Sequence, residues 1–199
     1  MPSETIQQLL REHATSDAVA IKYGDRQWTW REHLRDASAR AAALLTLVDR
    51  DRPVHVGVLL GNTPEFLNQM AAAGLGGYVL CGLNTTRRGA ALAADVRRAD
   101  CQVVVTDAEH RPLLDGIDLG DVQVVDASNE DWVRMLEAAG ELSPYREACP
   151  LDPYMLIFTS GTSGDPKAVK VSHFMVLMSG AQLGGWCFSR GVPRLIAAA

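Results

Sequence analysis

The sequence has few cysteines and no metal-binding pattern among them. The 199 residues include four cysteines, Cys81, Cys101, Cys149 and Cys187, and no two of them form a C-x-x-C pair. Such wide spacing matches neither a zinc site nor a disulfide framework. We therefore expect no metal site, and thiols that are reduced and mostly buried in a cytoplasmic protein.

Long hydrophobic runs and an excess of basic charge are also absent. The longest apolar stretch, residues 70–83, is interrupted by glycines and is too short to span a bilayer. The N-terminus lacks the basic and then apolar pattern of a signal peptide. A net charge of −5 and a pI near 5.5 argue against nucleic acid as a main partner.

Strand-like and helix-like segments alternate along most of the chain. Thr29 and Glu32 form a capping-box pattern ahead of one predicted helix, and Pro64 marks the first turn of another. The alternation predicts an α/β fold with a largely parallel sheet flanked by helices. The predicted strands are 18–23, 27–29, 54–60, 77–80, 102–106 and 122–125, and the predicted helices are 5–13, 30–48, one from Pro64, 88–100, 108–114 and 129–139. Residues 140–153 are predicted to be a connector, followed by a hairpin and a helix over 172–188.

The most informative segment is F-T-S-G-T-S-G-D-P-K-A-V, at residues 158–169. An apolar strand leads into small and hydroxylated residues that end in a lysine. Glycines let the backbone approach an anion closely, and successive amide and hydroxyl donors bind phosphate. It is not a Walker loop, which needs G-x-x-x-x-G-K-[ST] ahead of a helix. The alternative is an exposed Gly/Ser turn. The candidate phosphate-binding residues are Thr159, Ser160, Gly161, Thr162, Ser163, Gly164 and Lys167.

This segment resembles the signature [YF]-T-S-G-[ST]-[TS]-G-x-P-K-G of the adenylate-forming (ANL) superfamily, with Ala168 in place of the last glycine. That superfamily contains acyl-CoA synthetases, peptide-synthetase adenylation domains and luciferases. Three further segments are similar to family elements and follow in the family's order: residues 28–34, 73–84 and 99–107. Among its branches the chain looks most similar to actinobacterial fatty-acyl-CoA ligases.

The resemblance implies a reaction and its reactants. A fatty or other carboxylic acid would attack the α-phosphorus of ATP, Mg²⁺ would leave with pyrophosphate, and coenzyme A would take the acyl group. Residues 159–164 would hold the β- and γ-phosphates, and Lys167 would neutralise the leaving charge or steady the loop. The family's adenine-binding segment, Mg²⁺-binding glutamate and C-terminal catalytic lysine have no counterpart in this sequence.

Length qualifies the expected activity. Members of the family are much longer than 199 residues, so we expect residues 1–188 to be the N-terminal portion of an AMP-binding domain and 189–199 a tail unlike the family. We expect a truncated chain, inactive by itself as a ligase. Its last predicted helix is apolar around most of its circumference. Several large side chains there should face water and favour self-association.

Two other functions remain open from the sequence. The chain could be a stand-alone nucleotide- or phosphate-binding module, or a structural α/β domain whose Gly/Ser loop is only a turn. Arg87 and Arg88, at a predicted helix start, are interpreted as surface residues rather than anion ligands. His173 is interpreted as a residue of a helix start rather than a catalytic one.

Overall fold

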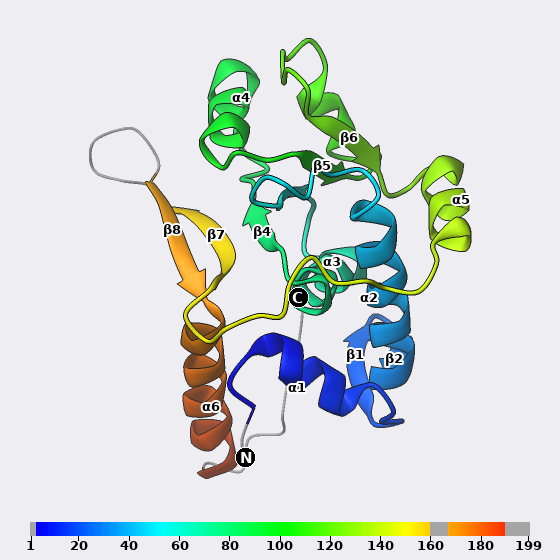
Figure 1. The fold of residues 1–199 in the computed structure, drawn as a ribbon, viewed down its shortest axis with the longest axis vertical. Coiled ribbons are helices and arrows are strands. Elements are labelled where there is room, and N and C mark those ends of the chain that lie inside the picture. The colour runs from blue at the N-terminus through cyan, green and yellow to red at the C-terminus, as the bar shows by residue number, and fades with distance from the viewer. Residues whose placement is uncertain (1–2, 160–166, 190–199) are drawn as a thin grey trace.

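The computed structural model describes residues 3–159 and 167–189, and Figure 1 shows their arrangement. The chain begins with helix α1 (Ile6–His13), the hairpin β1 (Val19–Tyr23) and β2 (Arg26–Thr29), and helix α2 (Trp30–Leu44). Then follow β3 (His55–Leu59), α3 (Pro64–Gly76), β4 (Val79–Gly82), α4 (Gly89–Arg98), β5 (Val103–Thr106), the short 3₁₀ helix η1 (Arg111–Leu114), β6 (Gln123–Asp126) and α5 (Glu130–Ala138). The described part closes with β7 (Pro153–Thr159), β8 (Lys167–Ser172) and α6 (His173–Ser189).

A six-stranded sheet forms the centre of the fold, in the order β6-β5-β3-β4-β7-β8. The first five of these strands are mutually parallel, and β8 runs antiparallel to β7 at the edge. The predicted α/β class with a largely parallel sheet is therefore confirmed. The sequence Val-Val-Val-Thr of β5, with all four residues buried, is typical of a strand covered on both faces.

Helices cover the two faces of this sheet unequally. On one face α1, α2, α3 and α5 pack over a large apolar cluster that includes Leu44, Val56 and Trp132. On the other face α4 and η1 cover a smaller cluster that includes Leu92 and Cys101. No helix among the described residues is both long and apolar enough to cross a membrane.

Local sequence signals place the starts of α2 and α6 correctly. The predicted capping box is present: the Thr29 hydroxyl accepts a hydrogen bond from the Glu32 amide, and the Glu32 carboxylate accepts one from the Thr29 amide. At the start of α6, the Ser172 hydroxyl accepts a hydrogen bond from the Met175 amide at 3.2 Å, as an N-cap does.

Several element boundaries differ from the sequence prediction, and α2 and β4 are two examples. Helix α2 ends at Leu44 instead of continuing to Val48. Strand β4 begins at Val79 rather than at Gly77, because Gly77 adopts φ +70° and ψ +28° and ends α3 as a left-handed C-cap. A glycine read as the start of a strand is therefore the end of a helix.

Candidate functional site

The predicted phosphate-binding segment lies at the open end of the β7–β8 hairpin. Strand β7 ends at Thr159 and β8 begins at Lys167, and these two residues face each other in the antiparallel register. Both side chains are exposed. The other five candidates, Ser160, Gly161, Thr162, Ser163 and Gly164, lie outside the described residues. The structure thus places Thr159, which carries a hydroxyl, opposite Lys167, which carries an amine, and these two residues flank the segment.

This end of the hairpin is also the carboxyl end of the parallel strands. Gly82 of β4 is in register with Ile157 of β7, so the chain that follows β4 leaves the sheet beside Thr159. In open α/β sheets ligands bind outside the carboxyl ends of the strands. The position of Thr159 and Lys167 therefore suits a ligand site.

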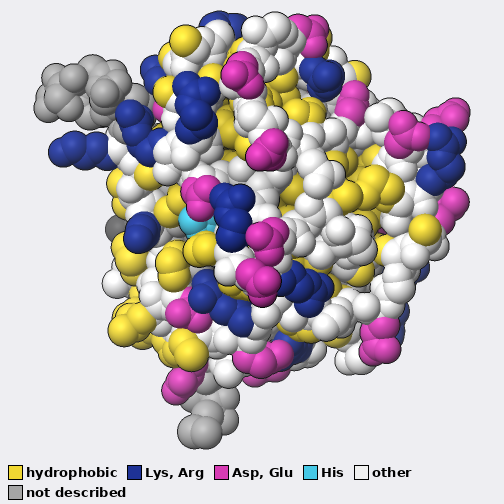
Figure 2. Space-filling model, turned by 45° about the horizontal axis from the view of Figure 1, so that its top comes forward, with side chains coloured by type: hydrophobic (Ala, Val, Ile, Leu, Met, Phe, Trp, Pro, Cys, Tyr) yellow, Lys and Arg dark blue, Asp and Glu magenta, His cyan; other side chains and the backbone are white. Residues whose placement is uncertain are grey.

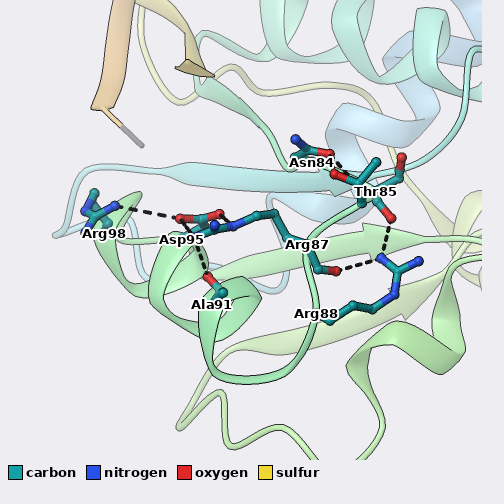
Figure 3. Close-up of polar contacts among 8 residues, drawn as sticks. Asn84, Thr85, Arg87, Arg88, Ala91, Asp95 and Arg98 are labelled. Carbon is teal, nitrogen blue, oxygen red and sulfur yellow. Dashed lines mark hydrogen bonds and ion pairs between the residues drawn. The ribbon is translucent and has the colours of Figure 1, made fainter. Parts of the chain in front are cut away.

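The loop after β4, residues 84–88, is held by its own hydrogen bonds (Figure 3). The Asn84 side-chain oxygen accepts from the Thr86 amide and from the Thr86 hydroxyl, both at 2.8 Å. The Arg88 guanidinium donates to the Thr85 carbonyl at 2.6 Å and to the Arg87 carbonyl at 2.8 Å. Arg88 is exposed, as the sequence predicted.

Arg87 differs from its predicted surface role. Its Nε lies 2.9 Å from Oδ2 of Asp95, whose side chain is 1% exposed, and its own side chain is 27% exposed. Arg98 lies 3.7 Å from the same carboxylate, and Figure 3 shows both arginines directed at it. Arg87 is therefore half-buried because it neutralises a buried carboxylate on α4 and so anchors the loop to that helix.

His173 is the first residue of α6, where the sequence placed a helix start. The ring is buried, its Nδ1 accepts a hydrogen bond from the Ile6 amide at 3.3 Å, and it lies 5.1 Å from the Tyr154 ring. Burial lowers the pKa of His173 and keeps it neutral, with Arg146 acting in the same direction and Asp152 against it. These contacts join α1, β7 and α6 and serve packing.

Among the described residues no metal cluster lies at the hairpin. The described residues contain no group of three or more histidine, cysteine or acidic side chains that could hold a metal ion. A pocket of about 660 Å³ lies between α1, α2 and the segment before β7, where Arg11 and Glu147 form a two-bonded ion pair. Hydroxyl and lysine groups are therefore the chemistry that the described part of the candidate site offers, and they suit an anion.

Comparison with known proteins identifies the family. The family model described as "AMP-binding enzyme" matches residues 10–194. A medium/long-chain-fatty-acid–CoA ligase, FadD17 of Mycobacterium marinum, is 44% identical over 181 residues, which are 90% of this chain and 35% of the relative. The steroid-22-oyl-CoA synthetase of Rhodococcus jostii is 39% identical over 175 residues, 85% of this chain and 31% of the relative. The chain belongs to the AMP-binding enzyme family, and it spans about a third of the length of these curated relatives.

Solved structures agree on the fold. A putative long-chain-fatty-acid CoA ligase from Rhodopseudomonas palustris superposes with a TM-score of 0.77 at 21% identity, over 92% of this chain and 48% of that one. The N-terminal domain of FACL13 from Mycobacterium tuberculosis gives 0.73 at 23% identity, over 85% and 44%. At such identities the likeness concerns the fold alone.

Proposed function

We propose that this chain supplies the phosphate-binding part of an ATP-dependent fatty-acid–CoA ligase in the cytoplasm. One observation carries the proposal. Thr159 and Lys167 face each other at the carboxyl end of the sheet, where they flank the central residues of the family's signature segment. The chain that carries this segment is 44% identical to a fatty-acid–CoA ligase. The relative's name supplies the substrate class, a medium- or long-chain fatty acid.

The proposed reaction requires little from the protein beyond positioning the reactants and stabilising the charge on the leaving phosphates. In the proposed reaction the substrate carboxylate attacks the α-phosphorus of ATP, the bond to the bridging oxygen breaks, and pyrophosphate leaves with the bonding electrons. The thiol of coenzyme A then displaces AMP from the acyl group. Hydrogen-bond donors and a cation beside the leaving phosphates stabilise the developing charge without covalent participation by the protein.

Each candidate residue has a separate part in this proposal. Lys167, at the first position of β8, would place its ammonium against the leaving phosphates. Thr159, directly across the hairpin, would donate its hydroxyl to a phosphate oxygen. Residues 160–164 would add amide and hydroxyl donors, and that assignment rests on the sequence. Mg²⁺ would bind with the phosphates of ATP, since the described residues offer no acidic cluster for it.

The first test is binding of magnesium pyrophosphate and ATP to the 199-residue chain by titration calorimetry. Because Lys167 would form a charge-assisted hydrogen bond, Lys167→Ala should weaken binding by about tenfold or more. Lys170→Ala is the matched control. It removes the same charge three residues further along the same strand, on the opposite face, and binding should change by less than about twofold. Equal affinities for the Lys167 variant and its parent would remove this lysine from the site.

A second measurement separates a ligase part from a stand-alone phosphate-binding module. The chain alone, with fatty acid, ATP and Mg²⁺, should form no acyl-AMP, because it spans about a third of its relatives. Joined in frame to the remaining portion of the M. marinum relative, it should form acyl-AMP in a Lys167-dependent way. Phosphate binding without adenylation in the joined protein would favour the stand-alone module.

A further inference from the structure

A second candidate binding site lies away from the hairpin, in the pocket of about 660 Å³ between α1, α2 and the segment before β7. In Figure 1 that segment crosses the view from α5 to β7, above α1. Leu75, which lines the pocket, belongs to the last turn of α3, and α3 leads into the amino end of β4. Thr159 and Lys167 lie at the carboxyl end of the sheet, so the pocket and the hairpin site are at opposite ends of the strands.

The base of the pocket is aliphatic. The buried side chains of Leu34 and Leu75 lie there, and half-buried Leu142 and Pro144 line the side formed by the segment before β7. The volume is within the usual range for small-molecule sites, about 300–1,000 Å³. Such a surface favours an alkyl chain, because covering it removes apolar area from water.

The rim of the pocket is basic. The exposed charged side chains that line it are Arg11, Arg31, Arg35 and Glu147. These three arginines and one glutamate carry a net charge of +2, in a chain whose net charge is −5. On the face that Figure 2 shows, by contrast, basic and acidic side chains are intermixed. A basic rim over an aliphatic base suits a ligand with an anionic head and an apolar body.

Two of these arginines are placed where the helix itself does not favour them. Arg31 and Arg35 are four residues apart in the first turns of α2, so they lie on the same side of the helix, together with Leu34. Like charges at this spacing destabilise a helix, and cations near its N-terminus oppose the helix dipole. An anion bound between the two guanidinium groups would relieve both effects.

Both guanidinium groups keep a donor for such an anion. Arg31 donates from Nε and Nη2 to Asp17, at 2.8 and 3.1 Å, and from Nη2 to the Thr15 carbonyl at 2.6 Å. Arg35 donates from Nε and Nη2 to the neighbouring Asp36, at 3.1 and 3.0 Å. In the described part of the chain, neither Nη1 has a hydrogen-bond partner. The Arg35 side chain is 74% exposed, so its ion pair with Asp36 contributes little and can be exchanged.

The charges in the pocket favour a carboxylate over a phosphate. Arg11 already binds the Glu147 carboxylate through two hydrogen bonds, at 2.7 and 2.9 Å, which is the paired geometry that guanidinium groups form with carboxylates. Glu147 also places a negative charge in the lining, and repulsion from it is greater for a dianionic phosphate than for a monoanionic carboxylate.

We propose that this pocket binds an alkyl carboxylate, a free fatty acid of medium chain length, at a site separate from the hairpin. The carboxylate accepts hydrogen bonds from Nη1 of Arg31 and Nη1 of Arg35, and the alkyl chain lies over Leu34, Leu75 and Leu142. A fatty acid held there is not the molecule that reacts with ATP. The inference uses neither the signature segment nor the proposed reaction.

The test is equilibrium dialysis of the 199-residue chain against labelled decanoate, below the concentration at which decanoate forms micelles. We expect saturable binding of one molecule per chain, with slower hydrogen exchange at residues 31–38 and 142–147. Butyrate, which has a short chain, and decanol, which has no charge, should each bind about tenfold or more weakly. Decyl phosphate should also bind more weakly than decanoate, and tighter binding of the phosphate would contradict the choice of a carboxylate.

Two variants locate the site. Arg35→Gln should weaken decanoate binding by about fivefold or more, because a charge-assisted hydrogen bond is lost. Ser38→Phe keeps every charge but places a ring in the pocket, and it should weaken binding to a similar extent. The matched control is Arg134→Gln, which removes a 66% exposed, ion-paired arginine from α5 and should change binding by less than about twofold.

Magnesium pyrophosphate and Lys167→Ala distinguish this pocket from the hairpin. Neither should alter decanoate binding, so a failure of phosphate binding at the hairpin would leave this proposal standing. Competition between decanoate and pyrophosphate would overturn it by placing the fatty acid at the hairpin. Binding insensitive to both Arg35→Gln and Ser38→Phe would place the fatty acid elsewhere, as on the exposed Phe174, Met175 and Met178 of α6. Absence of saturable decanoate binding would also overturn the proposal.

Discussion

At the scale of single residues, the most consequential group is the carboxylate of Asp95. It is 1% exposed and is neutralised by Arg87 from the loop after β4, with Arg98 nearby. Removing one partner of a buried ion pair leaves the other charge desolvated without compensation, which costs more than the pair itself contributes. The same substitution at a surface pair costs little, because water replaces the lost partner.

We expect Asp95→Asn to lower the free energy of unfolding by about 2–3 kcal/mol, below the value for a fully buried pair because Arg87 keeps some contact with water. The matched control is Asp131→Asn, which removes the carboxylate from the exposed pair with Arg134 and should cost less than about 1 kcal/mol. Urea unfolding of the three proteins measures both values. Equal costs at the two sites would show that burial does not govern the Arg87–Asp95 pair.

The ion pair between Arg87 and Asp95 could not be predicted from the sequence, although other contacts could. The capping box of Thr29 and Glu32 is a local pattern, four residues long, and the structure confirms it. Arg87 and Asp95 are eight residues apart in different elements, and only the fold determines that α4 turns Asp95 inward. The pairing of Thr159 with Lys167 is intermediate in how far it can be predicted, because the sequence indicates a strand, a turn and a second strand.

At the scale of secondary-structure elements, the end of α3 determines how the segment before β7 is held. Gly77 takes a left-handed conformation, and a Cβ there would lie 2.2 Å from the carbonyl oxygen of Arg146. The Tyr145 amide donates to the Gly76 carbonyl at 2.7 Å, so this segment packs directly on the helix end. Such close backbone approach requires glycine.

Gly77→Ala should therefore destabilise the protein by about 2–4 kcal/mol, the sum of a left-handed backbone cost and displacement of the segment. Gly24→Ala provides the control. Gly24 also has positive φ, at +56°, but no atom lies within 4 Å of its would-be Cβ, so only the backbone cost of about 1–2 kcal/mol applies. Thermal or urea unfolding compares the two. A Gly77 variant no less stable than the Gly24 variant would mean that the segment moves aside freely.

Elements were easier to predict from the sequence than their ends and contacts. Alternating apolar runs and helical patterns give the α/β order, because period and burial are local properties. The sequence pattern wrongly places Gly77 at the start of a strand, because its contact with Arg146, which is distant in the sequence, is visible only in the fold. The last helix, apolar around most of its circumference, was predicted to expose several large side chains, and Phe174, Met175 and Met178 are exposed in the structure.

At the scale of the whole molecule, two buried histidines connect stability to pH. His173 joins α6 to α1 through the Ile6 amide, and the Nδ1 of His33 on α2 lies 2.7 Å from the Asn68 side-chain oxygen on α3. Burial lowers the pKa of both rings from the ordinary value of 6.5. For His33 the hydrogen bond to Asn68 and the charge of Asp36 oppose this shift, and Arg40 reinforces it.

The direction of these shifts determines the pH dependence. The unfolded chain takes up protons near pH 6.5 and the folded chain only at lower pH, so the free energy of unfolding falls as pH drops below about 6.5. Protonated His173 would also lose the acceptor for the Ile6 amide and place a positive charge at the N-terminus of α6, which the helix dipole disfavours.

Urea unfolding between about pH 5.5 and 7.5, above the range of ordinary carboxyl groups, isolates the histidine contribution. His173→Gln keeps a side-chain acceptor but cannot titrate, so its stability should fall less steeply over this range, and adding His33→Gln should flatten the curve further. If the stability of the His173 variant depended on pH as steeply as that of the parent protein, the His173 ring would not contribute to the pH dependence.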